Sequence, residues 1–176
     1  MTEPLPRALA ELIDREQIRN LVLGYSHAME ARDVDAMAAL FAPHARFGEH
    51  GTGPDACRAL MADSLANSVF AVILVANHHI VLDDADHAHG EVWAQCYAQN
   101  RDEPFVEQVI RYVDRYERHD GAWRFLHRRH RLWYGVERDR SPLEQDAADW
   151  PRSQVGVGDV PLADERFRTW WESRHR

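Results

Sequence analysis

The apolar residues change their spacing once along this chain, and that change restricts the fold more than any other feature. Early in the chain they recur at the three- and four-residue intervals of a helix, as in Ile18, Leu21, Val22, Tyr25, Ala28 and Met29. Four later segments have the pattern of strands: residues 77–83, 89–99, 105–118 and 123–135. Helices followed by consecutive strands predict an α+β domain with an antiparallel sheet.

Local signals predict where the helices begin. Asp14, with Gln17 three residues later, has the pattern of a capping box at the start of the first helix. Asp33 is a typical N-cap for a second, short helix. Pro54 is typical of a first helical position and predicts a third helix over residues 54–67.

Two further signals concern the strands. Residues 45–49, ARFGE, predict a short strand between the second and third helices. His119-Asp120-Gly121 predicts a tight hairpin between the last two long strands, because aspartate and glycine tolerate the backbone of a two-residue turn.

Composition and charge exclude several classes of function. The 176 residues suggest one domain, and 29 acidic against 21 basic residues give a net charge of −8, unlike a nucleic-acid-binding protein. The longest apolar run, residues 69–76, is too short to cross a bilayer. Two cysteines, Cys57 and Cys96, and an acidic N-terminal segment without a signal-peptide core predict a cytoplasmic protein.

The last forty residues differ from the rest of the chain. Three prolines interrupt them, yet they contain Trp150, Phe167, Trp170 and Trp171, whereas disordered tails are poor in aromatic residues. We therefore predict a main domain over residues 1–136. Residues 137–176 would form an arm packed on that domain or on a partner subunit, the alternative being a mobile tail.

One stretch of sequence points to a known family. YVDRYER at residues 112–118, followed by Asp120-Gly121 and Trp123, resembles the SnoaL-like family of the nuclear transport factor 2-like superfamily. The helix that carries Tyr25 and the segment ARDVDAMAALFAPHARF after it extend the resemblance to roughly residues 10–135. It implies a curved antiparallel sheet wrapped around a pocket, with the N-terminal helices on its concave side, commonly in dimers.

The family resemblance also implies a chemistry. Members include scytalone dehydratase, ketosteroid isomerase, hexachlorocyclohexane dehydrochlorinase and bile-acid dehydratase, which move protons without metal or cofactor. They need a base beside an acidic C–H bond and a donor facing the developing oxyanion. Other members are non-catalytic, such as the small subunits of ring-hydroxylating dioxygenases, so the fold alone does not settle the function.

The resemblance assigns three positions of a catalytic centre. Tyr25 lies where ketosteroid isomerase and bile-acid dehydratase place an active-site tyrosine, although a purely structural core tyrosine is the alternative. Glu30 lies where the dehydratases place an aspartate that orients a catalytic histidine. Ile73 occupies the position of that histidine in this chain, so the carboxylate–histidine pair of the dehydratases is incomplete here. His78 and His79 are the nearest substitutes, and simple strand alternation directs His79 inward if Asn77 points inward.

Further candidates lie on the strands and near the predicted short strand. Glu49 is near the ketosteroid isomerase base, and Asp114 is at the position of its protonated aspartate, although Asp114 could instead pair with an arginine. Arg128 matches a pocket position of the dehydrochlorinase. His130 shares its strand face with Arg128 and Leu132, and is a candidate base or donor.

One face of the 89–99 strand carries residues suited to a ring-bearing ligand. Trp93 and Tyr97 would give flat apolar walls, and Gln95 is near the second histidine of scytalone dehydratase. Core packing would explain both aromatic residues equally well.

These observations lead to one prediction and one alternative. We predict a dehydratase-, isomerase- or cyclase-like enzyme with no metal and no cofactor, acting on a small hydrophobic ring compound. It would form a homodimer or a higher homo-oligomer and have neither nucleic-acid nor membrane partners. The alternative is a non-catalytic ligand-binding or assembly domain of the same fold, including a role like that of a dioxygenase small subunit.

Overall fold

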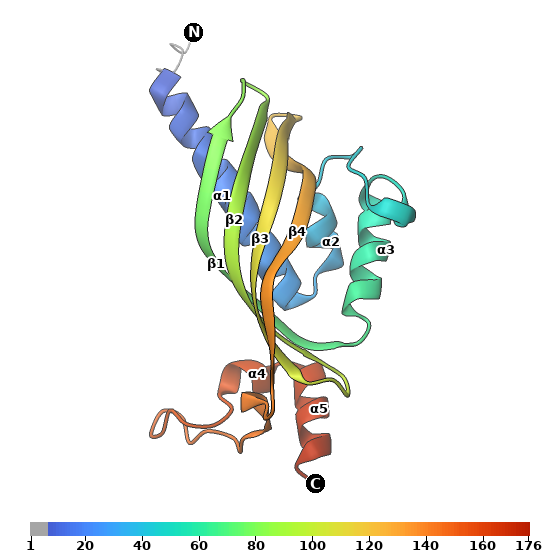
Figure 1. The fold of residues 1–176 in the computed structure, drawn as a ribbon, viewed down its shortest axis with the longest axis vertical. Helices are drawn as coiled ribbons and strands as arrows, with labels where there is room; N and C mark the ends of the chain where they lie inside the picture. Colours follow the sequence, from blue (N-terminus) through green and yellow to red (C-terminus); the bar gives the residue numbers. More distant parts are fainter. Residues whose placement is uncertain (1–6) are drawn as a thin grey trace.

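The computed structural model describes residues 7–176 and places three helices before a four-stranded sheet (Figure 1). The described elements in chain order are α1 (Arg7–Ala31), α2 (Val34–Ala39), η1 (Gly48–His50), α3 (Pro54–Leu65), β1 (Ser68–Leu82), β2 (His87–Asn100), β3 (Phe105–His119), β4 (Ala122–Arg138), η2 (Pro142–Glu144), α4 (Asp159–Ala163) and α5 (Glu165–Arg174). None of the helices within residues 7–176 is both long and apolar enough to cross a membrane.

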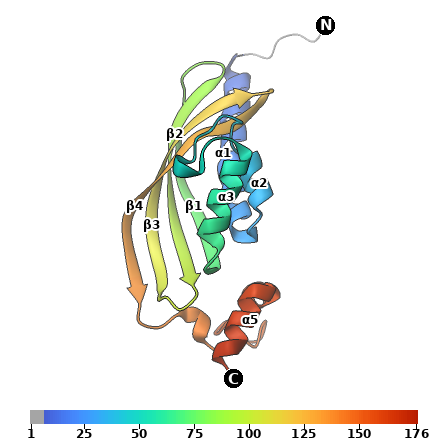
Figure 2. The same ribbon diagram turned by 90° about the vertical axis from the view of Figure 1, so that its right-hand side faces the viewer.

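The sheet is curved and antiparallel, with the strand order β1-β2-β3-β4. Helices α1, α2 and α3 all cover the same face of this sheet (Figure 2). Small buried residues of β2, such as Ala88 and Ala94, face the helices, while Ile18, Leu21 and Val22 of α1 complete the core. The predicted α+β fold with a curved antiparallel sheet is therefore confirmed.

Several of the predicted element boundaries are confirmed. The Oδ1 atom of Asp33 accepts a hydrogen bond from the backbone N–H of Ala36 at 2.8 Å and so caps α2. Pro54 begins α3. Asp120 and Gly121 both have positive φ angles, 49° and 77°, as the hairpin between β3 and β4 requires.

Other boundary predictions are wrong. Helix α1 already begins at Arg7 in the described residues, so Asp14 lies inside it and does not cap it. The Asp14 carboxylate instead accepts hydrogen bonds from Nη2 of Arg118 at 2.6 Å and from Nε1 of Trp123 at 3.1 Å, which joins α1 to β3 and β4. Residues 45–49 form only one isolated bridge, between Arg46 and Thr52.

The first strand is longer than predicted and contains a bulge. It begins at Ser68, so the apolar run at residues 69–76 belongs to it. Val75 pairs with Ala94 and His78 with Val92, so β1 advances three residues while β2 advances two. The extra residue reverses the alternation of side chains beyond Val75.

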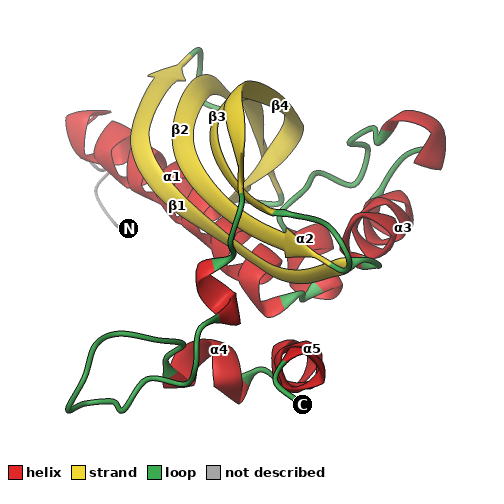
Figure 3. Ribbon diagram, turned by 60° about the horizontal axis from the view of Figure 1, so that its bottom comes forward, coloured by secondary structure: helices red, strands yellow, loops and turns green. Residues whose placement is uncertain are grey.

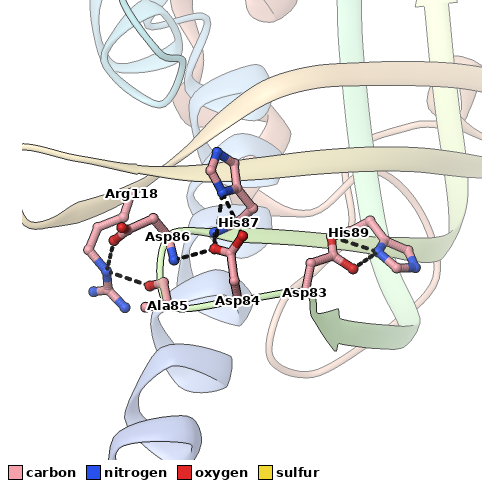
Figure 4. Close-up of polar contacts among 7 residues, drawn as sticks. All are labelled: Asp83, Asp84, Ala85, Asp86, His87, His89 and Arg118. Atoms are coloured by element: carbon pink, nitrogen blue, oxygen red, sulfur yellow. Dashed lines mark hydrogen bonds and ion pairs between the residues drawn. The ribbon is translucent and has the colours of Figure 1, made fainter.

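The turn between β1 and β2 is closed by aspartate side chains (Figure 4). Oδ1 of Asp84 accepts hydrogen bonds from the backbone N–H groups of Asp86 and His87, both at 2.8 Å, and these bonds and the His87 ring lower the pKa of Asp84. His89 pairs with Asp83 at 2.8 Å. Within residues 7–176, however, no three His, Cys, Asp or Glu side chains are grouped so that they could hold a metal ion.

The C-terminal segment packs against the start of β1 and forms a second small core. Phe167 of α5 is fully buried and lies edge-on to Phe70, with ring centroids 5.9 Å apart. Val69, Val157 and Trp170 complete this cluster. Figure 3 shows α4 and α5 at the end of the sheet, away from α1.

Strand β4 is an edge strand of the open sheet. Near its start, Phe125 exchanges backbone hydrogen bonds with Leu40 and Ala42. From His127 to Arg138, no other segment of the described chain pairs with its outer edge. Most of this stretch is exposed, and its side chains include Arg129 and Arg131.

Candidate active site

A cavity of about 970 Å³ lies between the helices and the face of the sheet that they cover. Helix α1 contributes Tyr25, β3 contributes Tyr112, and β4 contributes Arg128 and His130. Segment 46–50, which includes Glu49, lines another part of the wall. This volume is at the upper end of the range found for small-molecule sites.

Arg128 is a buried cation held in place by one carboxylate. It lies opposite Asp114 in the β3–β4 register, and its Nε and Nη2 atoms donate to Oδ1 and Oδ2 of Asp114 at 3.0 and 2.7 Å. The Arg128 side chain is 3% exposed and that of Asp114 is 0% exposed. Burial alone would lower the pKa of Arg128, but the bonded carboxylate outweighs burial and raises it.

Three aromatic rings surround the same guanidinium group. The central carbon of Arg128 lies 4.4 Å from the ring centroid of Tyr25, 4.2 Å from that of Tyr112 and 4.3 Å from that of Phe125. These are cation–π distances. The rings and the carboxylate together fix the guanidinium in the cavity wall.

A chain of hydrogen bonds continues behind the ion pair. The hydroxyl of Tyr116 donates to Oδ2 of Asp114 at 2.9 Å, and Nε2 of His78 lies 3.1 Å from the Tyr116 oxygen. Because the single phenol proton is directed at Asp114, Nε2 of His78 must be the donor in the second bond. Burial lowers the pKa of His78 to about 4, so this imidazole is neutral at neutral pH.

Three of the polar groups that border the cavity are left without a hydrogen-bond partner from the described residues. In the part of the chain that the structure describes, the hydroxyls of Tyr25 and Tyr112 and the ring of His130 make no hydrogen bond. The ring centroids of Tyr25 and Tyr112 are 5.7 Å apart, and those of Tyr112 and His130 are 5.6 Å apart. Burial raises the pKa of both phenols, and partial burial lowers the pKa of His130, which remains accessible to solvent, so all three groups are neutral at neutral pH.

The structure brings six of the ten predicted site residues to this region. Tyr25, Glu49, Tyr97, Arg128 and His130 border the cavity, and Asp114 lies directly behind Arg128. The hydroxyl of Tyr97, however, accepts a hydrogen bond from Nε2 of the exposed Gln95 at 2.7 Å, so this end of the side chain does not serve the cavity.

The other four predicted residues lie away from the cavity. Glu30 is exposed, because five residues along a helix turn a side chain through about 140° from Tyr25. His79 is exposed on the sheet face without helices, here called the outer face, because the bulge in β1 turns His78 inward instead. Trp93 and Gln95 are also on the outer face, opposite to the buried Val92 and Ala94.

Sequence reasoning missed three residues of this region. Tyr112 and Tyr116 share the strand face of Asp114, so alternation within YVDRY could have identified both. His78 could not be found in this way, because nothing in the local sequence marks the bulge. Ile73 is buried in the cavity wall, so no histidine replaces it at that position.

The comparisons with known proteins agree with this architecture. The family model of the SnoaL-like domain matches residues 10–129. No protein among the curated ones matches the chain.

Several solved structures resemble the chain. A hexachlorocyclohexane dehydrochlorinase of type 3 from Novosphingobium barchaimii LL02 is 20% identical, with a TM-score of 0.70, over 76% of this chain and 96% of that one. A protein described as a candidate scytalone dehydratase from Novosphingobium aromaticivorans DSM 12444 is 18% identical, with a TM-score of 0.66, over 76% of this chain and 93% of that one. A nuclear transport factor 2-like protein with a cystatin-like fold, also from Novosphingobium aromaticivorans, is 21% identical, with a TM-score of 0.58, over 72% of this chain and 86% of that one. At these identities the likeness concerns the fold.

Proposed function

Because this chain belongs to the SnoaL-like domain family, we propose that it is a cofactor-independent lyase or isomerase that moves a proton on a cyclic, largely apolar small molecule. The observation that carries the proposal is the contact cluster of Tyr25, Tyr112, Arg128 and His130 on one cavity wall. Two phenols and an imidazole without protein partners are suited to a ligand that offers one acceptor and one acidic proton.

Each group has a role that follows from its chemistry. His130 is neutral and can accept the proton as general base, since partial burial lowers its pKa. Tyr25 and Tyr112 donate to the carbonyl oxygen on which negative charge develops. Arg128, held by Asp114, lies against both rings and fixes their positions. Glu49 on the cavity wall is the second candidate base.

Proton exchange on a model ketone tests this proposal. We expect the protein to accelerate the exchange of the acidic ring protons of 2-tetralone for deuterium, followed by NMR. His130→Gln should reduce the rate by roughly 10²–10⁴-fold, the usual contribution of a general base. Glu30→Gln, on the exposed side of α1, is the matched control and should leave the rate unchanged. Equal rates for wild type and His130→Gln would rule out His130 as the base.

A non-catalytic ligand-binding or assembly domain, including a dioxygenase small-subunit-like role, is the second candidate. Two observations favour it: Ile73 occupies the expected histidine position, and Glu30 is exposed away from the cavity. Ligand binding without any proton exchange, unaffected by His130→Gln, would support this role.

We also propose a homo-oligomer and a cytoplasmic location. The outer face of the sheet supports the first, because Trp133 is 68% exposed and contacts Trp93 there, with ring centroids 5.3 Å apart. Free, buried Cys57 and Cys96 fit a reducing compartment. We retain the division into a main domain, residues 1–136, and an arm, residues 137–176, as a proposal.

A further inference from the structure

We propose that Asp114 determines the charge selectivity of the cavity, which accepts uncharged ring-bearing carbonyl compounds and rejects carboxylates of the same shape. The inference rests on the proposed function only in taking this cavity as the ligand site. It assigns to Asp114 a role in specificity, although Asp114 itself does not border the cavity.

The charge of Arg128 is cancelled by the carboxylate of Asp114 beside it. Asp114 accepts three hydrogen bonds, from Nε and Nη2 of Arg128 and from the hydroxyl of Tyr116. All three stabilise its charged form. Both side chains of the pair are almost fully buried, so solvent does not screen them and each cancels most of the other's field.

The rest of the cavity wall has no net charge. With histidines counted as neutral, the other charged residues that line the cavity are Arg46 and Glu49, one of each sign on the same segment. Tyr25 and Tyr112 are neutral because of their burial, and His130 is neutral because partial burial lowers its pKa. The inner wall therefore offers hydrogen-bond donors and no net positive charge.

A carboxylate and a ketone meet different conditions in such a cavity. A carboxylate would lose its hydration without gaining a cation that is free to pair with it, which is costly. A ketone oxygen needs only the donors that Tyr25 and Tyr112 provide. If the charge of Asp114 were removed, Arg128 would become an unpaired cation in the wall and would attract anions.

Two probes of matched shape test this inference: neutral 2-acetylnaphthalene and anionic 2-naphthoate, measured by titration calorimetry. We expect the wild type to bind 2-acetylnaphthalene at least about tenfold more tightly. Asp114→Asn should strengthen 2-naphthoate binding by at least about tenfold. Glu30→Gln removes the same charge from an exposed residue of α1 that lies away from the cavity, and it should change 2-naphthoate binding by less than about threefold, because solvent screens it.

Specific outcomes would overturn the inference. Equal or tighter binding of 2-naphthoate by the wild type would do so without any variant, as would failure of both probes to bind at millimolar concentration. If Asp114→Asn does not fold, by circular dichroism, the double variant Asp114→Asn/Arg128→Gln restores a neutral pair and should still prefer 2-acetylnaphthalene. A retained preference together with absent proton exchange would count against catalysis and leave the charge selectivity intact.

Discussion

His78 occupies an unusual place for a histidine, half-buried against Tyr116 at the end of a hydrogen-bonded chain that reaches the cavity wall. Gly90 lies beside it on β2, and a Cβ atom there would lie 2.5 Å from the carbonyl oxygen of His79, so a glycine permits the close approach of β1 and β2 at this point. The imidazole must stay neutral in this position, because burial disfavours the charged form.

This burial makes stability depend on pH. The pKa of His78 is about 4 in the folded chain against about 6.5 in an unfolded one, so the unfolded chain binds more protons between these values. We expect the free energy of unfolding, measured with urea, to fall as the pH is lowered from 6.5 towards 4. His78→Gln should remove part of this slope, and His79→Gln, the exposed neighbour, should not. Identical slopes for both variants would contradict the assignment.

At the scale of elements, Phe167 belongs to the small core that joins the C-terminal segment to the start of β1. Phe167 is 0% exposed, and truncating a buried phenylalanine costs about 3–5 kcal/mol. In Phe167→Ala we expect faster hydrogen exchange across residues 139–176 and unchanged protection in α1 and β2. Val160→Ala, at a residue that is 73% exposed, is the control. Equal loss of protection in the arm and the sheet would show one cooperative unit and would count against a separate arm.

The elements also show what the sequence could reveal. Asp33, Pro54 and the Asp120-Gly121 turn act through local backbone geometry, so their effects could be predicted from short segments. The bulge before His78 depends on pairing with a distant strand, and the alternation rule therefore failed beyond Val75. Similarly, Asp14 has the pattern of a cap, but its partners Arg118 and Trp123 lie more than a hundred residues away.

The candidate site was predictable to the extent that a strand or helix face is regular. Tyr25, Arg128 and His130 border the cavity as expected, because one helix face and one strand face carry them. Trp93 was misplaced, because a half-buried aromatic residue fits either side of a sheet. Only the packing of α1 against the small residues of β2 decides which side it takes.

At the scale of the whole molecule, the outer face of the sheet is the strongest candidate for subunit contact. Trp133 is 68% exposed beside Trp93, and no helix of the described chain covers this face. We expect Trp133→Lys to lower the association state measured by sedimentation velocity, because it places a charge in an apolar contact. Leu12→Lys, at a 58% exposed residue of α1, should not change it. An unchanged association state in Trp133→Lys would exclude this face as the contact.

The unpaired edge of β4 affects how copies of the chain associate at high protein concentration. An open strand border can recruit another copy and extend into a fibre. Here two such borders meeting side by side would bring Arg129 and Arg131 of each copy close to those of the other, and like charges repel. These basic side chains thus oppose edge-to-edge pairing of two β4 strands, and concentrated salt would weaken that protection.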